Sequence, residues 1–216
     1  MLFCLTAASN TARAATYYVD TNNPNAGDDN PGTTEALPWK TLTKAANTAQ
    51  AGDTVLVKAG IYNETLRPAN SGASGAMITF KAYPGEECQG EYTKTNCQVV
   101  IDGEYTRKTV DLTGRSYIRI EGFEIRYAKE KEHGVYLSNS YVIEIVNNHI
   151  HHNDVYTPNY WEGSSGITIN GDAGDILIKD NDIHHNYFNG ISPYYAPSLS
   201  NFRIIDNDIH HNGNDC

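Results

Sequence analysis

The sequence predicts an all-β fold of stacked coils, a right-handed parallel β-helix, on three observations. The first is a heptapeptide that recurs in the second half of the chain, at residues 147–153, 180–186 and 206–212. The second is the spacing of its central isoleucines, since Ile150, Ile183 and Ile209 are 33 and 26 residues apart. The third is the set of three short apolar runs in each repeat. A near-constant period of this length is typical of solenoids, in which each coil stacks on its neighbours.

The apolar runs justify the strands. The third run of each repeat surrounds the central isoleucine, and the other two precede it: 134–137 and 142–145, 166–169 and 175–178, 190–193 and 202–205. Short runs rich in β-branched residues, separated by Asn, Asp and Gly, are typical of strands rather than helices. We therefore predict three strands per coil and about 25 residues per coil. An earlier, degenerate copy places Ile125 25 residues before Ile150, so the 33-residue coil carries an insertion.

Two polar side chains recur with the repeat. Asn148, Asn181 and Asn207 each precede the third strand, where Asn can adopt a left-handed conformation and its amide can bond the coils on either side. We predict a structural Asn ladder there. Histidine doublets follow the central isoleucines. Because they recur as scaffold positions do, a stacked His ladder at a turn is favoured over a transition-metal site.

The N-terminal segment predicts export and a cap. Residues 1–15 combine a short apolar run with an Ala-x-Ala end, which is typical of the remnant of a secretory signal peptide. We expect a secreted, extracellular or periplasmic protein whose β-helix domain is residues 16–216. A strand at Thr16–Asp20 opens it. Thr41–Gln50 is predicted to be a short capping helix, because Leu42, Ala45, Ala46 and Ala49 form one apolar face.

Three segments carry a resemblance to a known group. Residues 51–62, 77–86 and 100–103 are similar to the N-terminal signature of secreted parallel β-helix proteins that act on polysaccharides, the family-nine pectate lyases and chondroitinase-B-like lyases. The resemblance implies the fold and a carbohydrate-active function. It also implies calcium held by carboxylates on neighbouring coils, and a lysine that removes the proton beside a uronate carboxyl group.

The cysteines add two expectations. Cys88 and Cys97 lie nine residues apart in a polar loop, and in an exported protein this spacing is typical of a disulfide. Cys216 falls where the repeat predicts another coil, so we expect the domain to be truncated on its C-terminal side.

The charge restricts the partners. A net charge of −10 argues against nucleic acid, which requires basic patches. The N-terminal apolar run is too short to span a membrane. Residues 134–216 carry ten carboxylates against two cations, or −8, which would repel an acidic glycan unless a cation such as calcium bridged the two. We expect a monomer that binds a polysaccharide, acidic in character.

The insertion in the long coil is the candidate for substrate binding. Insertions in solenoids often form the binding face. This one brings together aromatic and acidic residues, and a Tyr pair lies at a similar position one coil later: Asp154, Tyr156, Tyr160, Trp161, Glu162, Tyr194 and Tyr195. They could form the wall of a glycan cleft, or they could pack over the flank of the solenoid; the two interpretations are about equally supported.

The acidic turns are the candidate for a metal site. Asp172 and Asp175 flank Gly174, and Asp215 lies in the next region where a first strand begins, so the three could hold calcium. Lys179 is the candidate base, although it could instead pair with Asp180 or Asp206.

These observations predict a calcium-assisted polysaccharide lyase that cleaves a uronate-containing glycan by β-elimination. Two alternatives stay open: a non-catalytic adhesin or glycan-binding module, and a glycoside hydrolase or epimerase on the same scaffold.

Overall fold

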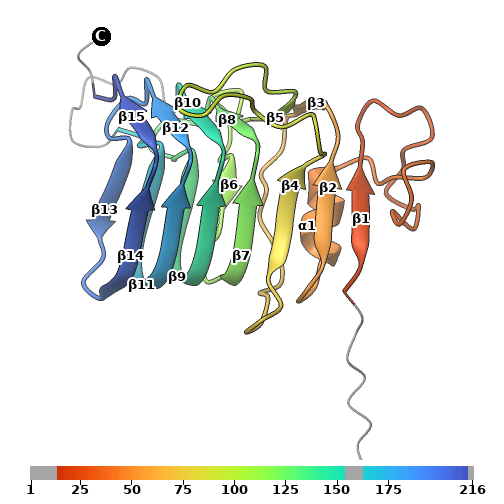
Figure 1. Cartoon of the computed structure of the whole chain (residues 1–216), viewed down its shortest axis with the longest axis horizontal. Coiled ribbons are helices and arrows are strands. Elements are labelled where there is room, and N and C mark those ends of the chain that lie inside the picture. Colours follow the sequence, from red (N-terminus) through yellow and green to blue (C-terminus); the bar gives the residue numbers. More distant parts are fainter. Residues whose placement is uncertain (1–13, 154–162, 214–216) are drawn as a thin grey trace, which may run out of the picture.

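The computed structural model describes residues 14–153 and 163–213, and in these ranges the chain forms a right-handed β-helix of stacked coils (Figure 1). All pairings between its named strands are parallel. The predicted fold class is confirmed. Among these residues, no helix is long and apolar enough to cross a membrane.

The strands form two sheets. The large sheet runs β1 (Thr16–Val19), β2 (Thr54–Val57), β4 (Ile78–Ala82), β7 (Ser116–Glu121), β9 (Val135–Val146), β11 (Ile167–Lys179) and β13 (Ile191–Tyr195), with β6 (Val110–Asp111) beside β9 and β14 (Leu199–Ile205) beside β11. The small sheet runs β15 (Asp208–His210), β12 (Asp182–His184), β10 (His149–His151), β8 (Glu124–Arg126), β5 (Val99–Asp102) and β3 (Gly60–Tyr62).

In two coils the first two predicted strands form one continuous strand, β9 or β11. In β9 the chain turns through left-handed residues at Asn139 and Val142, with φ of 51° and 55°. In β11 it turns through Gly171 and Asp175, with φ of 66° and 56°. At the bend the chain therefore passes from one face of the solenoid to the next without ending the strand.

Rows of aliphatic side chains fill the interior. Ile125, Ile150, Ile183 and Ile209 are in register on neighbouring strands of the small sheet. The first three are fully buried, whereas Ile209 is 42% exposed. The difference arises because β15 pairs on one side only in the described part of the chain.

The single helix of the described residues is α1 (Leu42–Thr48). Thr41 caps it, since its hydroxyl accepts a hydrogen bond from the Lys44 amide at 3.0 Å. Leu42, Ala45 and Ala46 are buried in the common core. The helix is shorter than the predicted Thr41–Gln50 because Ala49 leaves the helical conformation, with ψ at 138°.

Stacked Asn amides join the coils at two corners. Asn148 Nδ2 donates to Asn181 Oδ1 at 3.1 Å, and Asn181 Nδ2 donates to Asn207 Oδ1 at 2.8 Å. A second row with the same contacts is formed by Asn153, Asn186 and Asn212.

The left-handed residue at these corners is not the Asn, contrary to expectation, but the residue before it. Asn147, Asp180 and Asp206 have φ of 54–56° at the first corner. At the second corner His152, His185 and His211 have φ of 47–51°. The preceding residue makes the turn, so that the Asn side chain points inward to the backbone of the adjacent coils.

Cys88 and Cys97 form a disulfide. The loop that they close, residues 88–97, is called the disulfide loop below. It reaches the outer face of the small sheet, where the Lys94 amide donates to Asp182 Oδ2 at 2.8 Å. Lys94 is 3% exposed and Asp182 is fully buried. A loop from an early coil thus covers a strand of a late one.

Candidate functional site

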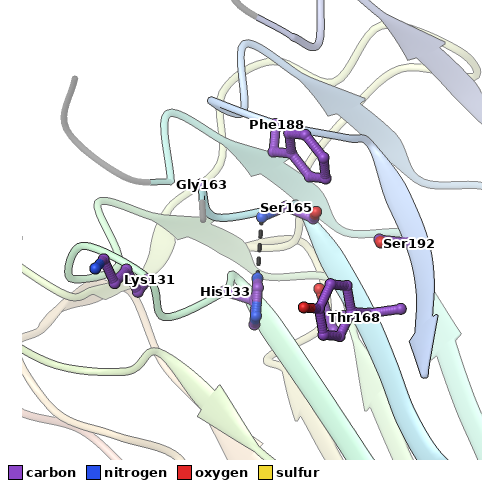
Figure 2. Close-up of a pocket in the computed structure, with 8 residues that line it drawn as sticks. Lys131, His133, Gly163, Ser165, Thr168, Phe188 and Ser192 are labelled. Carbon is purple, nitrogen blue, oxygen red and sulfur yellow. Dashed lines mark hydrogen bonds between the residues drawn. The ribbon is translucent and has the colours of Figure 1, made fainter. Parts of the chain in front are cut away.

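A pocket of about 290 Å³ opens beside the first strands of three successive coils (Figure 2). Two lining residues precede or open the first of these coils, three belong to the second and three to the third: Lys131 and His133; Gly163, Ser165 and Thr168; Phe188, Ser192 and Tyr194. The register explains part of this set, because Thr168 on β11 is paired with Ser192 on β13.

His133 is fixed in one orientation and one protonation state. Its Nδ1 accepts a hydrogen bond from the Ser165 amide at 3.0 Å (Figure 2), and its ring stacks on Tyr136 with centroids 5.5 Å apart. Burial, with a smaller contribution from the Lys108 charge, lowers the pKa of His133 to about 4. The ring is therefore neutral at pH 7. Because Nδ1 is an acceptor, the proton lies on Nε2, which is a hydrogen-bond donor.

Two hydroxyls in the pocket have no hydrogen-bond partner among the described residues. They are Ser165 Oγ and Thr168 Oγ1, on residues that are 1% and 2% exposed. A buried hydroxyl without a partner is unfavourable by about 1–3 kcal/mol. Such groups at the wall of a pocket favour a polar ligand that would complete their hydrogen bonds.

The predicted binding residues divide between the pocket and the segment outside the described ranges. Tyr194 lines the pocket and is 71% exposed, whereas its neighbour Tyr195 is 70% exposed and is not among the lining residues. The insertion residues Asp154, Tyr156, Tyr160, Trp161 and Glu162 lie outside the described residues, as does Asp215. Gly163, which directly follows the insertion, lines the pocket.

Four residues of the pocket were not predicted from the sequence: His133, Ser165, Thr168 and Ser192. A signal for two of them was present. In each repeat a Gly directly precedes the first strand, and the residue two positions after the Gly is polar, as at Thr168 and Ser192. Since side chains alternate along a strand, these positions face outward, next to the buried Ile167 and Ile169.

Lys179 lies at the end of β11, away from the residues that line the pocket. Its ammonium is 3.0 Å from Asp180 Oδ2. The hydrogen bond to Asp180 raises the pKa of Lys179, which makes the amine harder to deprotonate. This is the ion pair that the sequence analysis gave as the alternative to a catalytic base.

The described residues do not assemble a calcium cage at Asp172 and Asp175. Both carboxylates are exposed at the bend of β11. Asp175 Oδ1 accepts a hydrogen bond from the Asn201 amide. Among the residues described, neither belongs to a set of three ligands whose atoms lie within 4.8 Å of one another. A requirement for calcium therefore stays a prediction.

The His doublets form two stacked rows on the small sheet. His151, His184 and His210 stack with centroids 5.2 and 4.9 Å apart. His152, His185 and His211 stack with centroids 5.2 and 5.3 Å apart. The two rings of each doublet meet through their Nδ1 atoms, which are 2.6–2.7 Å apart. The left-handed second residue of each doublet makes this contact between consecutive side chains possible.

Comparison with known proteins decides the family. Residues 17–192 match the family described as "Pel9A-like, right handed beta helix region". The chain belongs to the Pel9A-like β-helix family.

This Pel9A-like chain is similar to parts of two longer curated proteins. Pectate lyase PEL9 of Emericella nidulans is 28% identical over 184 residues, which cover 80% of this chain and 40% of that protein. An uncharacterized protein of Bacillus subtilis, YwoF, is 29% identical over 161 residues, which cover 74% of this chain and 27% of that protein. The chain therefore spans less than half the length of the curated relatives it matches.

Solved structures share the fold of the Pel9A-like chain. The GH136 lacto-N-biosidase from Eubacterium ramulus matches with a TM-score of 0.60 at 18% identity, covering 89% of this chain and 41% of that one. Pectate lyase Pel9A matches with a TM-score of 0.55 at 18% identity, covering 86% of this chain and 52% of that one. Identities this low show the shared β-helix and no common reaction.

Proposed function

We propose that this chain is the sugar-binding part of a secreted, carbohydrate-active protein that cleaves a uronate-containing polysaccharide by β-elimination. The observation that carries the proposal is the pair of buried hydroxyls of Ser165 and Thr168 at the wall of the pocket, which have no hydrogen-bond partner among the described residues. Sugar hydroxyls both donate and accept hydrogen bonds, so they could satisfy these groups. The rings of Phe188 and Tyr194 add apolar surface for the face of a sugar.

The charge of the pocket supports an acidic sugar. The whole chain carries −10, yet none of the described lining residues is acidic, and one of them, Lys131, is cationic. The neutral His133 offers its Nε2–H as a further donor. Among the described lining residues a uronate carboxylate would therefore face no like charge, although the chain as a whole is anionic.

β-Elimination requires a base and a positive charge near the uronate carboxylate, which makes the neighbouring proton more acidic. Lys131 could supply positive charge. With a pKa of about 4, His133 is a weak base at neutral pH. We keep Lys179 as the predicted base and calcium as the predicted cofactor, held by Asp172, Asp175 and Asp215. The similarity to a pectate lyase over 80% of the chain supports this reaction class.

Export rests on two observations. The disulfide between Cys88 and Cys97 is of the kind that persists in oxidising compartments. Residues 1–15 have the composition of a signal peptide remnant. A monomer is proposed as the acting form.

The test is the ultraviolet absorbance of unsaturated uronate products from polygalacturonate, alginate and chondroitin, with calcium and with a chelator. The protein is compared with Ser165→Ala and with Asn63→Ala, whose exposed amide bonds Glu104 away from the pocket. Product that depends on calcium and falls in Ser165→Ala supports the proposal. Product formed in the presence of the chelator would show that the reaction does not require calcium.

A non-catalytic glycan-binding module is the second candidate, because burial lowers the pKa of His133 in the pocket to about 4 and the Lys179 ammonium is paired with Asp180. Glycan binding without product, weakened by Ser165→Ala, would assign this function. Absence of both binding and product would overturn the assignment of the pocket.

A further inference from the structure

We propose that His149, Asp182 and His184 bind a divalent transition-metal ion of the zinc class beneath the disulfide loop. The three residues lie on the outer face of the small sheet, on the neighbouring strands β10 and β12. They come together because His149 is in register with Asp182, and His184 follows Asp182 by two positions on the same face. The site is separate from the pocket and does not depend on the proposed function.

The ligand atoms converge on one point. His149 Nε2 is 2.7 Å from His184 Nε2, and these atoms lie 3.8 and 4.0 Å from Asp182 Oδ2. Zinc binds nitrogen and oxygen at about 2.0–2.1 Å in a tetrahedron, which places its ligands about 3.3 Å apart. The measured separations bracket that value, so small side-chain rotations would admit an ion.

The contact between the two imidazoles requires a cation or a proton. Two lone pairs at 2.7 Å repel each other, so either a hydrogen or a metal ion must lie between the rings. His149 Nδ1 faces Cys97 Sγ at 3.7 Å, and His184 Nδ1 faces His185 Nδ1 at 2.6 Å. When these Nδ1 atoms carry the protons, both Nε2 atoms present lone pairs to the site.

The surroundings of the Asp182 carboxylate independently favour a bound cation. The side chain is fully buried, and its Oδ1 has no hydrogen-bond partner among the described residues. His210 Nε2 lies 3.3 Å from Oδ1. No lysine ammonium or arginine guanidinium in the described ranges lies within 4.0 Å of this carboxylate, and the Lys94 ammonium bonds the Gly90 and Glu91 carbonyls instead. A buried carboxylate without a compensating cation is costly, and a bound metal ion would supply that charge.

The protonation state of the His149 and His184 rings suits such an ion. Burial, followed by repulsion from neighbouring imidazoles, lowers the pKa of His149 to about 4 and that of His184 to about 3. Neutral imidazole is the form that binds a metal. Two imidazoles and one carboxylate suit zinc, copper or nickel, whereas calcium prefers six to eight oxygens. The His149 and His184 side chains are 15% and 14% exposed, which leaves a path for entry.

The experiment titrates the full chain, with its disulfide intact, with Zn²⁺ by calorimetry and with Co²⁺ by visible absorption. We expect one ion per chain, an intense tetrahedral Co²⁺ spectrum, and no displacement by excess calcium. Asp182→Asn and His184→Gln should each weaken Zn²⁺ binding at least about tenfold. The matched control is His152→Asn, which removes an exposed ring from the stacked row of His152, His185 and His211.

Three results would overturn the site: no binding of either metal by the wild-type chain, equal affinity in Asp182→Asn, or an equal loss in His152→Asn. The last would assign the ion to the row of His152, His185 and His211. If Asp182→Asn does not fold, His149→Gln replaces it, and the Co²⁺ spectrum of the wild-type chain still decides whether nitrogen ligands bind the ion.

Discussion

The amide of Lys94 donates a hydrogen bond to the buried carboxylate of Asp182 at 2.8 Å, although the two residues are 88 positions apart in the chain. The disulfide loop holds the donor, and β12 holds the acceptor. This bond explains why an outward-facing residue of the small sheet is fully buried. It also places the loop next to the cluster of His149, Asp182 and His184.

Replacing Cys88 and Cys97 with serine should release the disulfide loop. Closing a loop of this length contributes about 2–3 kcal/mol through the entropy of the unfolded chain. We expect that loss in urea unfolding, together with faster hydrogen exchange at the Lys94 amide. Unchanged exchange at Lys94 would show that the loop is held by its other contacts.

Asn181→Ala should destabilise the protein by about 3 kcal/mol. The Asn181 side chain accepts from the Asn148 amide and donates to the Ile145 carbonyl, so its removal leaves buried groups unpaired in two coils. Urea unfolding measures the change. Asn63→Ala is the matched control, since Asn63 makes an exposed bond to Glu104 and should change stability by less than about 0.5 kcal/mol. Equal effects would contradict a structural role for the ladder.

Stability should fall as the pH drops from 6.5 towards 4, in part because of His133. Its pKa is about 4 in the folded chain against 6.5 as the ordinary value, so the unfolded chain binds more protons in this window. The contribution of the neutral ring is complete above pH 6.5 and is lost on acidification. At 1.36 kcal/mol per pKa unit the full loss is about 3 kcal/mol. Comparing urea unfolding of wild type and His133→Gln at pH 7 and 4.5 isolates this part, and identical pH dependence would contradict it.

Thr168→Val should stabilise the unliganded chain while weakening glycan binding. The substitution keeps the shape of the side chain and removes a buried hydroxyl that has no partner among the described residues. We expect a gain of about 1 kcal/mol in thermal unfolding and a loss of about tenfold in glycan affinity. A loss of stability would mean that the hydroxyl is already bonded in the folded protein.

Ile183→Ala and Ile209→Ala should differ, although the two residues are equivalent in the repeat. Ile183 is fully buried and should cost about 2–5 kcal/mol, whereas Ile209 is 42% exposed and should cost less than half as much. Urea unfolding of both variants measures the ratio. Equal costs would show that Ile209 is buried in solution.

Much of the scaffold could be predicted because it is periodic. Ile150 and Ile183 recur with Asn148 and Asn181, and each coil repeats the same contacts with its neighbours. The continuity of β11 through its bend could not be predicted in this way. Turn residues such as Gly171 mark a change of direction, but they do not show whether strand pairing continues.

The candidate site was predictable only in part. Tyr194 was identified from its aromatic character and lines the pocket. His133 was missed because its role depends on Ser165, which lies 32 residues later and meets it only after the coils have stacked.

The sequence by itself determined the coil, its period, its internal apolar rows and the disulfide, because these follow from local patterns that each repeat carries. Only the tertiary structure decided which polar groups meet. The register between coils places His149 beside Asp182, and the disulfide loop then excludes solvent from that carboxylate. Burial and convergence of side chains depend on contacts between distant segments, and no pattern within one segment encodes them.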